Sequence, residues 1–334
     1  MAEQVQVTVV NWNKKAFLEE CLQSLRSQTF RSFSVTVVDN GSTDGSQEWV
    51  AGRFPEVRLI ALKENLGFAA ANNCALRELA APYAALLNND AVADPHWLES
   101  LVGALEGTPE AGFAASRMLD QARPDRIDRC GDGYTWAGSG LLRGRGEPAG
   151  RHSRREWVFG ACAGAALYRS SLLREVGLFD EDFFLLYEDV DLSFRSQLSG
   201  HRCLYVPEAL VYHRGSGSLV YDSPVSVYYG HRNLEWVYIQ NMPTRLIART
   251  ILPHLLYDLA ALGFFFLCGR GGDYLRAKRD ALKGFKRALI KRRRVQAAKI
   301  ADDAYLWGLL DRPSLLARLR GRRVPWAGAD ANSG

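Results

Sequence analysis

The chain contains, between residues 34 and 45, the stretch Ser34-Val35-Thr36-Val37-Val38-Asp39-Asn40-Gly41-Ser42-Thr43-Asp44-Gly45. Its first half is rich in β-branched residues, which favour a buried strand, and its second half has the Asn, Asp, Gly and Ser residues of a turn. Similar apolar runs at residues 5–10, 57–61 and 83–87 also lead into polar loops, and residues 111–116 are a fifth candidate strand. The sequence therefore predicts a series of short buried strands with polar loops at one end.

Helical patterns separate these strands and lie at residues 16–27, 46–52, 68–79 and 95–105. In the last of them, Asp94 is the expected N-cap and Pro95 the first helical residue. Strands that alternate with helices predict an α/β fold, with a mostly parallel, Rossmann-like sheet covered by helices on both faces. In such sheets ligands bind beyond the carboxyl ends of the strands, so the polar loops form the candidate site.

Each of the first four predicted strands is followed by a different polar motif. The motifs are Asn11-Trp12-Asn13, the Asp39 to Gly45 loop, Asn65-Leu66-Gly67-Phe68 and Asn88-Asn89-Asp90. One such loop alone is more consistent with ordinary turn chemistry. Four of them at the same edge of a parallel sheet are expected to converge on one crevice.

A second acidic element lies at residues 179–192, with the sequence Phe-Asp-Glu-Asp-Phe-Phe-Leu-Leu-Tyr-Glu-Asp-Val-Asp-Leu. Its six carboxylates repel one another, which a folded chain tolerates best where a metal, a helix N-terminus or a polar substrate compensates. Acids in the first turn of an ordinary helix are the alternative interpretation. Together with Asp90 and with His213, which follows a later apolar run, the element favours an enzyme with Asp189 as catalytic base.

The remaining segments complete the predicted organisation. Residues 118–156 are rich in Gly, Arg and Pro without a clear period, and we expect a variable excursion over the site there. Further expected elements are a strand at 157–168, a helix at 170–176, a helix that ends near residue 198 and a strand at 203–206. We expect a catalytic domain over residues 1–240 and a helical, basic C-terminal region over residues 241–334.

The composition is that of a globular protein. Of the 334 residues, 47% are hydrophobic and 24% are charged, which excludes disordered and fibrous classes. The six cysteines have no zinc-like spacing and the first residues have no secretory signal pattern, so we expect reduced, buried thiols in a cytoplasmic protein. The sequence lacks the dinucleotide-binding glycine fingerprint and the P-loop pattern, which argues against dehydrogenases and kinases.

The ordered set of motifs resembles glycosyltransferase family 2, and in particular its bacterial rhamnosyltransferase-like branch. Besides the polar loops, the resemblance rests on Gly160-Ala161-Cys162, Tyr187-Glu188-Asp189-Val190-Asp191-Leu192 and Val211-Tyr212-His213, and it covers about residues 5–240. The resemblance implies the GT-A fold and an inverting, metal-dependent transfer of a sugar from a nucleoside diphosphate to a hydroxyl. Such a displacement needs a base for the acceptor hydroxyl and an electrophile for the departing diphosphate.

The resemblance also implies a role for each residue of the acidic motifs. Asp189 matches the family's general base, and Glu188 is expected to help it or to bind the acceptor. Asp90 is the last residue of the family's D-x-D element and is expected to bind the divalent metal, Mg²⁺ or Mn²⁺. The first acid of that element is replaced by Asn88, which is a poor metal ligand. His213 matches the histidine that completes the metal shell.

Other candidates concern the donor and the acceptor. Asp39 is expected to accept hydrogen bonds from the base or ribose, and Asn11 and Trp12 to hold the base, although Trp12 could equally be a core residue. Glu181 and Asp182 are expected at the rim, where an acceptor would bind. Further expected nucleotide or sugar ligands are Asn65, Asn73, Asn88 and Asn89.

These assignments predict a glycosyltransferase that extends a cell-surface polysaccharide. The expected donor is a dTDP- or UDP-sugar, with rhamnose as the expected sugar, and the expected acceptor is a glycan or a lipid-linked saccharide. A non-catalytic nucleotide-sugar-binding or scaffold protein is the alternative, and the intact Asp90, Asp189 and His213 count against it. A sugar nucleotidyltransferase would need a Gly-rich, Arg-containing loop where Asn11-Trp12-Asn13 stands.

The basic charge of the chain belongs to its C-terminal part. Residues 1–268 carry 25 Lys+Arg against 31 Asp+Glu, whereas residues 269–323 carry 17 against 5. Residues 250–269 have His254 and Asp258 as their only acidic or basic side chains, which is marginal for a membrane-spanning helix. An apolar helix followed by clustered Lys and Arg favours an interfacial anchor on an anionic membrane surface.

Two alternatives to this anchor are packing of the apolar helix against the catalytic domain and true membrane spanning. Nucleic acid is not an expected partner, because the apolar helix that precedes the basic cluster favours a membrane surface. We therefore expect a peripheral protein on the cytoplasmic face of the inner membrane.

Overall fold

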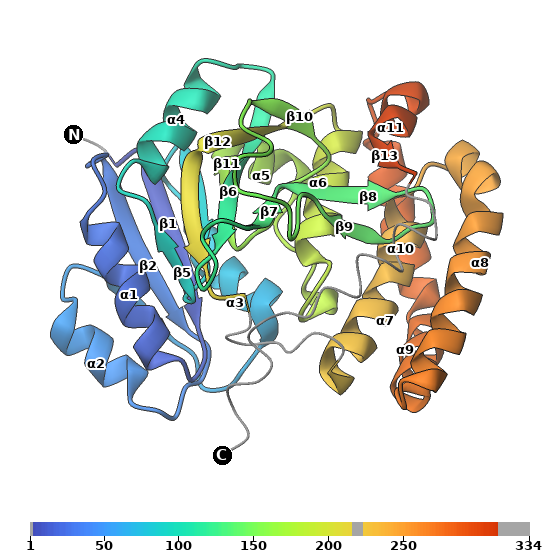
Figure 1. Cartoon of the computed structure of the whole chain (residues 1–334), viewed down its shortest axis with the longest axis horizontal. Coiled ribbons are helices and arrows are strands. Elements are labelled where there is room, and N and C mark those ends of the chain that lie inside the picture. The colour runs from blue at the N-terminus through green and yellow to red at the C-terminus, as the bar shows by residue number, and fades with distance from the viewer. Residues whose placement is uncertain (1–2, 216–222, 313–334) are drawn as a thin grey trace.

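The computed structural model describes residues 3–215 and 223–312 (Figure 1). Its main sheet has the strand order β10-β12-β6-β11-β4-β1-β2-β3, with β5 paired to β12 and β7 to β6. The strands of this sheet are β1 (Val5–Asn11), β2 (Phe33–Asp39), β3 (Arg58–Ala61), β4 (Tyr83–Leu87), β5 (Ala91–Ala93), β6 (Ala111–Asp120), β7 (Ile127–Cys130), β10 (Glu156–Val158), β11 (Ala165–Arg169) and β12 (Arg202–His213). The helices around it are α1 (Lys15–Arg26), α2 (Ser46–Arg53), α3 (Gly67–Leu76), α4 (Trp97–Glu106), α5 (Ser170–Val176), the 3-10 turn η1 (Glu181–Phe183) and α6 (Glu188–Leu198).

The sheet is parallel over its N-terminal half. β1 pairs in parallel with β2 and β4, and β2 with β3. β12 is parallel to β6, whereas β11 is antiparallel to both β4 and β6. The strands bury side chains on both faces, because one core cluster joins them to α1 and α4 and a second joins them to α5 and α6. The predicted α/β class with a mostly parallel, helix-covered sheet is confirmed.

Several predicted element boundaries differ from the observed ones. α4 begins at Trp97 rather than Pro95, because Asp94 accepts a hydrogen bond from His96 N in a turn that precedes the helix. The predicted strand at residues 157–168 is two strands, β10 and β11, with a loop between them. The predicted strand at residues 203–206 continues to the end of β12, past an irregularity between its two halves.

The predicted irregular excursion at residues 118–156 contains ordered strands. β7 pairs antiparallel with β6, and β8 (Asp132–Thr135) joins β9 (Gly140–Leu142) and β13 (Leu310–Asp311) in a second sheet. Asp128 on β7 and Asp132 on β8 are buried. The excursion therefore carries charged side chains into the interior.

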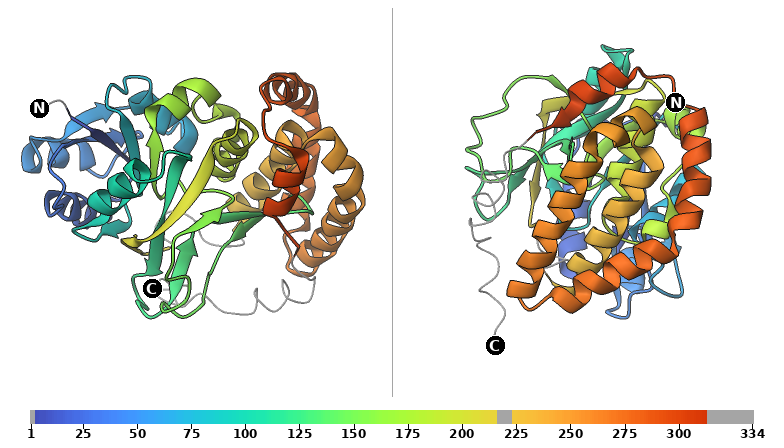
Figure 2. Two further views of the ribbon diagram at one scale, coloured as in Figure 1. Left: turned by 90° about the horizontal axis from the view of Figure 1, so that it is seen from above. Right: turned by 90° about the vertical axis from the view of Figure 1, so that its right-hand side faces the viewer.

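The C-terminal helices lie at the end of the molecule opposite β1 to β3 (Figure 2). They are α7 (Pro224–Asn241), α8 (Thr244–Leu267), α9 (Gly271–Lys283), α10 (Phe285–Ala297) and α11 (Asp303–Leu309). A core that includes Phe183, Trp236 and Leu306 joins α7 and α11 to the sheet-bearing part of the chain. The domain boundary after residue 240 stays a prediction, and residues 313–334 of the predicted basic region lie outside the described residues.

α10 is bound to the sheet-bearing part by its basic side chains. Lys291 Nζ lies 2.5 Å from Asp180 Oδ1 and also contacts Asp182. Arg292 donates to the backbone carbonyls of Ile239 and Met242 at the end of α7. Part of the basic charge that the sequence assigned to a membrane surface is thus used inside the protein.

The six cysteines are all free, as predicted. Cys21, Cys130 and Cys203 are buried, whereas Cys268 at the end of α8 is exposed. The prediction that all six are buried is wrong for Cys268, because the C-terminal end of α8 projects into solvent, where Leu267 is also exposed. Cys74 and Cys162 are only partly buried.

Candidate active site

The polar residues after β1, β2 and β4 meet at the carboxyl edge of the sheet. Asn11 Nδ2 donates to Asp39 Oδ2 at 3.1 Å, and Asn89 Nδ2 donates to Asn11 Oδ1 at 2.8 Å. Asp39 Oδ1 also accepts from Ser42 N and from Gln47 Nε2. The parallel register of β1 and β2, which sets Asn11 beside Asp39, explains the first contact. The predicted convergence of these loops is confirmed.

The loop after β3 is tied to the loop after β2 through Asn40. Asn40 Nδ2 donates to Asn65 Oδ1, and Asn40 Oδ1 accepts from Leu66 N, both at 2.9 Å. The next residue, Gly67, has φ of +85°, and a Cβ there would lie 2.5 Å from Phe184 O. Glycine is needed at this position both for the left-handed backbone and for the close approach of the acidic element.

Trp12 and Asn88 lie at the ends of β1 and β4. Trp12 exposes 47% of its surface, so the alternative that it is a core residue is wrong. The backbone N of Asn88 donates to Gly164 O, and its carbonyl accepts from the Cys21 thiol, while its side chain is partly buried. An exposed indole at a strand end is available for ring stacking.

The predicted metal ligands Asp90 and His213 are adjacent. β5 pairs antiparallel with β12 so that Ala91 is opposite His213, and this register brings Asp90 to the histidine. His213 Nε2 lies 3.3 Å from Asp90 Oδ1, and His213 Nδ1 lies 2.9 Å from Asp128 Oδ2. A carboxylate oxygen and an imidazole nitrogen are ligands that Mn²⁺ and Mg²⁺ accept, so the pair fits a divalent cation.

The surroundings of His213 favour a positive charge at this position. Burial opposes the charge, but the hydrogen bonds to Asp128 and Asp90 outweigh it and raise the pKa of His213 to about 9. For Asp128, burial is likewise outweighed by His213, and its pKa is lowered to about 2. A metal at Nε2 would take the place of the proton there, while Asp128 at Nδ1 would keep the ring oriented.

Asp189 lies in the first turn of α6. Its Oδ1 accepts from Val190 N at 2.8 Å and its Oδ2 from Ala163 N at 3.3 Å. These two backbone N–H groups hold the carboxylate in one orientation at the start of the helix. Asp189 is also partly exposed, as a base that meets a substrate hydroxyl must be.

Glu188, the residue before it, has different surroundings. Its side chain is buried, and burial together with the neighbouring Asp189 raises the pKa of Glu188 well above its ordinary value. Within the part of the chain that the structure describes, Glu188 Oε2 has no hydrogen-bond donor. A carboxyl group in such a position favours its neutral form.

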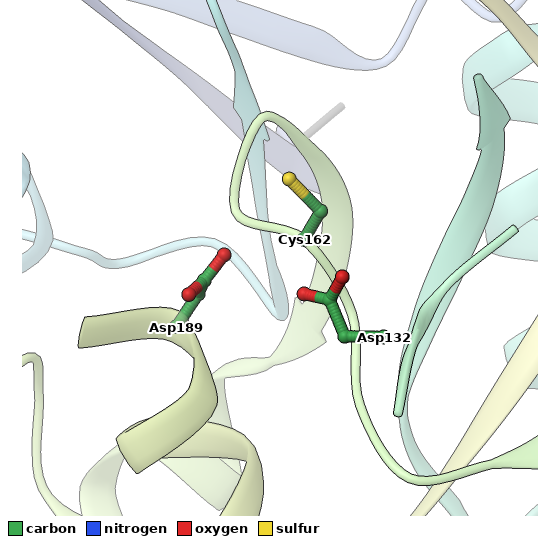
Figure 3. A group of neighbouring side chains, drawn as sticks. All are labelled: Asp132, Cys162 and Asp189. Atoms are coloured by element: carbon green, nitrogen blue, oxygen red, sulfur yellow. The ribbon is translucent and has the colours of Figure 1, made fainter. Parts of the chain in front are cut away.

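Asp132 and Cys162 face Asp189 (Figure 3). One carboxylate oxygen of each aspartate and the Cys162 sulfur all lie within 4.8 Å of one another. Arg129 Nη1 lies 3.3 Å from Asp132 Oδ1, so a guanidinium already supplies the positive charge that such a group would otherwise take from a metal. Burial raises the pKa of Asp132 to about 7, against the opposing charge of Arg129 and with a smaller contribution from Asp189.

Asp128, Arg129 and Asp132 are the site residues that the sequence patterns missed. They occur in the run Ile127-Asp128-Arg129-Cys130-Gly131-Asp132, which is too short and too polar for a clear strand period. The sequence signal that points to these three residues is an unusual density of charge, two acids and an arginine within residues 127–132, next to apolar residues and a glycine.

The segment before Asp189 has an unusual backbone. Phe184, Leu186 and Tyr187 have φ of 62°, 67° and 71°, a region that costs energy for residues with a Cβ. Asn233 Nδ2 of α7 donates to three carbonyl oxygens of this segment, at 2.7–2.9 Å. α7 therefore holds the conformation from which α6 begins.

Asn73, a predicted nucleotide or sugar ligand, contacts the start of the acidic element. Its Nδ2 donates to Phe179 O and to Glu181 Oε1, both at 2.9 Å, and its Oδ1 accepts from Phe179 N. These contacts engage both ends of the amide and favour a structural role. The predicted role of Asn73 as a ligand stays a prediction.

The predicted acceptor-side acids are paired with cations. Glu181 contacts Arg77, at the C-terminal end of α3. Asp182 contacts Arg287 and Lys291 of α10. An acceptor that bound at this rim would meet paired charges rather than bare carboxylates, and the role of the two acids stays a prediction.

Comparison with known proteins links the sequence to one family. A model described as Glycosyl transferase family 2 matches residues 6–177. The chain is 29% identical over 266 residues to N-acetylglucosaminyl-diphospho-decaprenol L-rhamnosyltransferase of Mycobacterium tuberculosis, which covers 72% of this chain and 85% of that protein. It is 33% identical over 189 residues to pre-mycofactocin glycosyltransferase of the same organism, which covers 55% of this chain and 38% of that protein.

Solved structures share the fold. The mannosyltransferase PcManGT from Pyrobaculum calidifontis, in complex with GDP-Man and Mn²⁺, matches with a TM-score of 0.54 at 18% identity over 89% of this chain and 86% of its own. S. aureus TarS 1-349 matches with a TM-score of 0.53 at 17% identity over 92% of this chain and 93% of its own. The predicted GT-A type of fold is confirmed.

Proposed function

Because the chain belongs to glycosyl transferase family 2, whose model matches more than half of it, we propose an inverting, metal-assisted transfer of a sugar from a nucleoside diphosphate to an acceptor hydroxyl. One observation carries this mechanism. A series of neighbouring charged side chains leads from the Asp90 and His213 pair through Asp128, Arg129 and Asp132 to Asp189. Neighbouring charged side chains thus join the proposed metal ligands to the proposed base, which supports a single site for both.

In the proposed reaction the acceptor oxygen attacks the anomeric carbon of the donor sugar. As the new carbon–oxygen bond forms, the bond to the diphosphate breaks and the nucleoside diphosphate leaves. The hydroxyl proton passes to Asp189, whose carboxylate is held by Ala163 N and Val190 N. Glu188 beside it is buried, and its raised pKa disfavours a second negative charge next to the base.

Asp90 and His213 are the residues that would hold the divalent cation. When bound, the cation supplies charge neutralisation for the leaving diphosphate. Mn²⁺ is present in the complex of the similar mannosyltransferase, and we infer Mg²⁺ or Mn²⁺ here. Asn11, Asp39, Asn65, Asn89 and the exposed Trp12 are proposed for the nucleotide and sugar.

The donor and acceptor are inferred from a relative. The rhamnosyltransferase of M. tuberculosis is named for L-rhamnose and for a diphospho-decaprenol acceptor. We propose by analogy a dTDP- or UDP-sugar donor such as a rhamnose nucleotide. The proposed acceptor is a lipid-linked saccharide in the synthesis of a cell-surface polysaccharide.

The proposed location is the anionic surface of the cytoplasmic membrane, and α8 supports it. α8 is the one helix among the described residues whose length and composition would allow it to cross a membrane. His254 on one face is buried against Ala137 O and Glu235. Another face exposes an apolar stripe, which consists of Leu252, Leu255, Leu256 and Leu259. A helix that packs on one face and exposes leucines on the other is suited to lie in the membrane interface.

The test combines a donor screen with one isosteric variant. Purified protein with Mn²⁺ is assayed for hydrolysis and transfer with uridine, thymidine and guanosine diphosphate sugars. Asp189→Asn should lower turnover by about 10²–10⁴-fold, because general base catalysis contributes that much, and should change donor affinity little. If the protein turns over none of these donors, the non-catalytic alternative is favoured. An unchanged rate in Asp189→Asn would refute the assignment of Asp189 as the base.

A further inference from the structure

A polar pocket outside the site described above lies between α7, α9 and α10. Its volume is about 440 Å³. Most of its lining is charged, with four cations and a single carboxylate: Arg232, Lys283, Lys286, Arg287 and Asp280. The excess of positive charge favours an anionic ligand.

The floor of the pocket is the packed indole ring of Trp236. Trp236 is buried and donates from Nε1 to Ala281 O at 3.1 Å. The guanidinium groups of Arg232 and Arg287 lie 4.4 and 5.5 Å from its ring centre. A Cβ at Gly284 would be 2.5 Å from the Trp236 ring, so this position lets the junction of α9 and α10 close over the indole. Trp236 thus positions two of the four cations, Arg232 and Arg287, while Lys283 and Lys286 extend from the neighbouring turn of α9 and the start of α10.

The acidic groups near the pocket do not cancel its charge. Asp280 accepts from Tyr228 Oη at 3.1 Å and pairs with Lys283 at 3.0 Å. Asp182 lies 2.9 Å from Arg287 but also contacts Lys291 of α10. Each of these acids therefore faces more than one donor.

An apolar rim borders these cations on the same two helices. It consists of Leu282, Phe285, Leu289 and Ile290, all of which are exposed, and Ile290 also lines the pocket. A free phosphate would gain no binding free energy from such a rim. A lipid with a charged head group would gain binding free energy from the cations and from the apolar rim.

We propose that this pocket binds the diphosphate group of a lipid, with the start of the lipid chain along the apolar rim. This inference rests on the proposed function, because such a lipid is the carrier part of the proposed acceptor. Arg232 also donates to the carbonyls of Asp182 and Phe183, in the segment that leads to Asp189. The lipid site and the base are thus connected through one arginine and one short segment.

The experiment measures binding of farnesyl diphosphate to the full chain by calorimetry in EDTA, which suppresses metal-dependent diphosphate binding at the donor site. The pocket variant is Lys283→Gln, Lys286→Gln, Arg287→Gln. The control removes the same charge from α9 and α10 at positions that do not line the pocket, as Arg276→Gln, Arg293→Gln, Arg294→Gln. Affinity should fall by about 10-fold or more in the pocket variant and by less than about twofold in the control.

A second variant, Lys286→Gln alone, leaves the Arg287 to Asp182 pair in place and guards against misfolding of the triple variant. It should weaken binding by about threefold. Equal losses in the pocket and control variants would overturn the proposal, since they would indicate unspecific attraction. Equally tight binding of inorganic pyrophosphate, or of dihexanoylphosphatidylglycerol, would also overturn it, because the first lacks the chain and the second the diphosphate.

This measurement does not depend on turnover. If farnesyl diphosphate fails to bind while the wild-type protein hydrolyses a donor in an Asp189-dependent manner, the lipid site is refuted and the proposed function stands. If the lipid binds and no donor is turned over, the lipid site stands and the proposed function is refuted.

Discussion

Asp189, Glu188 and Asp132 are close together, yet their side chains have different surroundings. Asp189 accepts from two backbone N–H groups at the start of α6. Glu188 is buried with a raised pKa, and burial also raises the pKa of Asp132. Acids that share a site but differ in environment can hold different protonation states at one pH. Asp189 is the partly exposed member of the three, and the proposed role as base needs that access to the acceptor hydroxyl.

Asp132→Asn is expected to remove a pH-dependent loss of stability. Because the folded protein has a pKa of about 7 at Asp132, it binds a proton that the unfolded chain releases above about pH 4. The free energy of unfolding therefore falls as pH rises between these values, by roughly 2–4 kcal/mol for this group. Melting temperatures measured in EDTA from pH 4 to 8 should fall less steeply for the variant. Parallel profiles of the two proteins would contradict the assignment.

Asp128→Asn should weaken metal binding without removing a ligand. Asp128 holds Nδ1 of His213 at 2.9 Å, and loss of such a partner costs about 10–100-fold in metal affinity. The Mn²⁺ concentration for half-maximal donor hydrolysis should rise by that factor. Asp120→Asn, which removes a carboxylate paired with Arg123, is the matched control and should leave it unchanged. An unaltered Mn²⁺ requirement in both variants would mean that His213 needs no orienting partner.

Among the helices, α7 stabilises the backbone conformation of the segment from which α6 begins. The residues before α6 have positive φ angles, and Asn233 satisfies the carbonyls that this conformation turns toward α7. Gly67 allows the segment to approach α3 from the other side. The position of Asp189 therefore depends on a helix that follows it by some forty residues in the sequence.

Asn233→Ala should lower turnover by about 10-fold or more while the protein remains folded, because the segment before Asp189 loses three hydrogen bonds and the base is displaced. Gln296→Ala is the control, since its amide also donates to carbonyls of α7, those of Gln240 and Asn241, but at the far end of that helix. Equal effects of the two variants on turnover and melting temperature would mean that Asn233 contributes only to the overall stability of the protein and does not position Asp189.

The sequence predicts those elements whose signal is local. The β-branched runs and the turn residues predict β1 to β4 and the polar loops at their ends. The motifs single out Asp90, Asp189 and His213 as candidate site residues. β7 and β8 were not predicted, because Asp128 and Asp132 become strand residues only through pairing with β6 and with the distant β13. The contact of Lys291 with Asp180 links residues 111 positions apart, so a local pattern could only suggest a solvent-facing or membrane-facing charge.

For the molecule as a whole, the C-terminal helices are part of the folded unit. Glu235 of α7 contacts His254 Nε2 of α8 at 3.1 Å and Lys278 of α9, and Lys278 lies 2.7 Å from Asp258 of α8. Leu306 of α11 lies in the same core as Trp236. Deletion of residues 245–334 would therefore open a core and leave Glu235 without its cation, a change that costs several kcal/mol. Substitution, rather than truncation, is the informative test of membrane association.

The triple variant Leu252→Gln, Leu255→Gln, Leu259→Gln should release the protein from membranes and keep it folded. These side chains are exposed, so little packing is lost, while each leucine withheld from the interface removes about 1.5 kcal/mol or more of binding free energy. Co-sedimentation with vesicles that contain anionic lipid should fall by at least about 10-fold. Ile300→Gln, at an exposed position outside α8, should bind as the wild type does. If the triple variant still sediments with the vesicles, the apolar stripe is not the anchor and charge alone attaches the protein. Binding should then disappear in high salt, because salt screens surface charges within about 10 Å at 0.1 M.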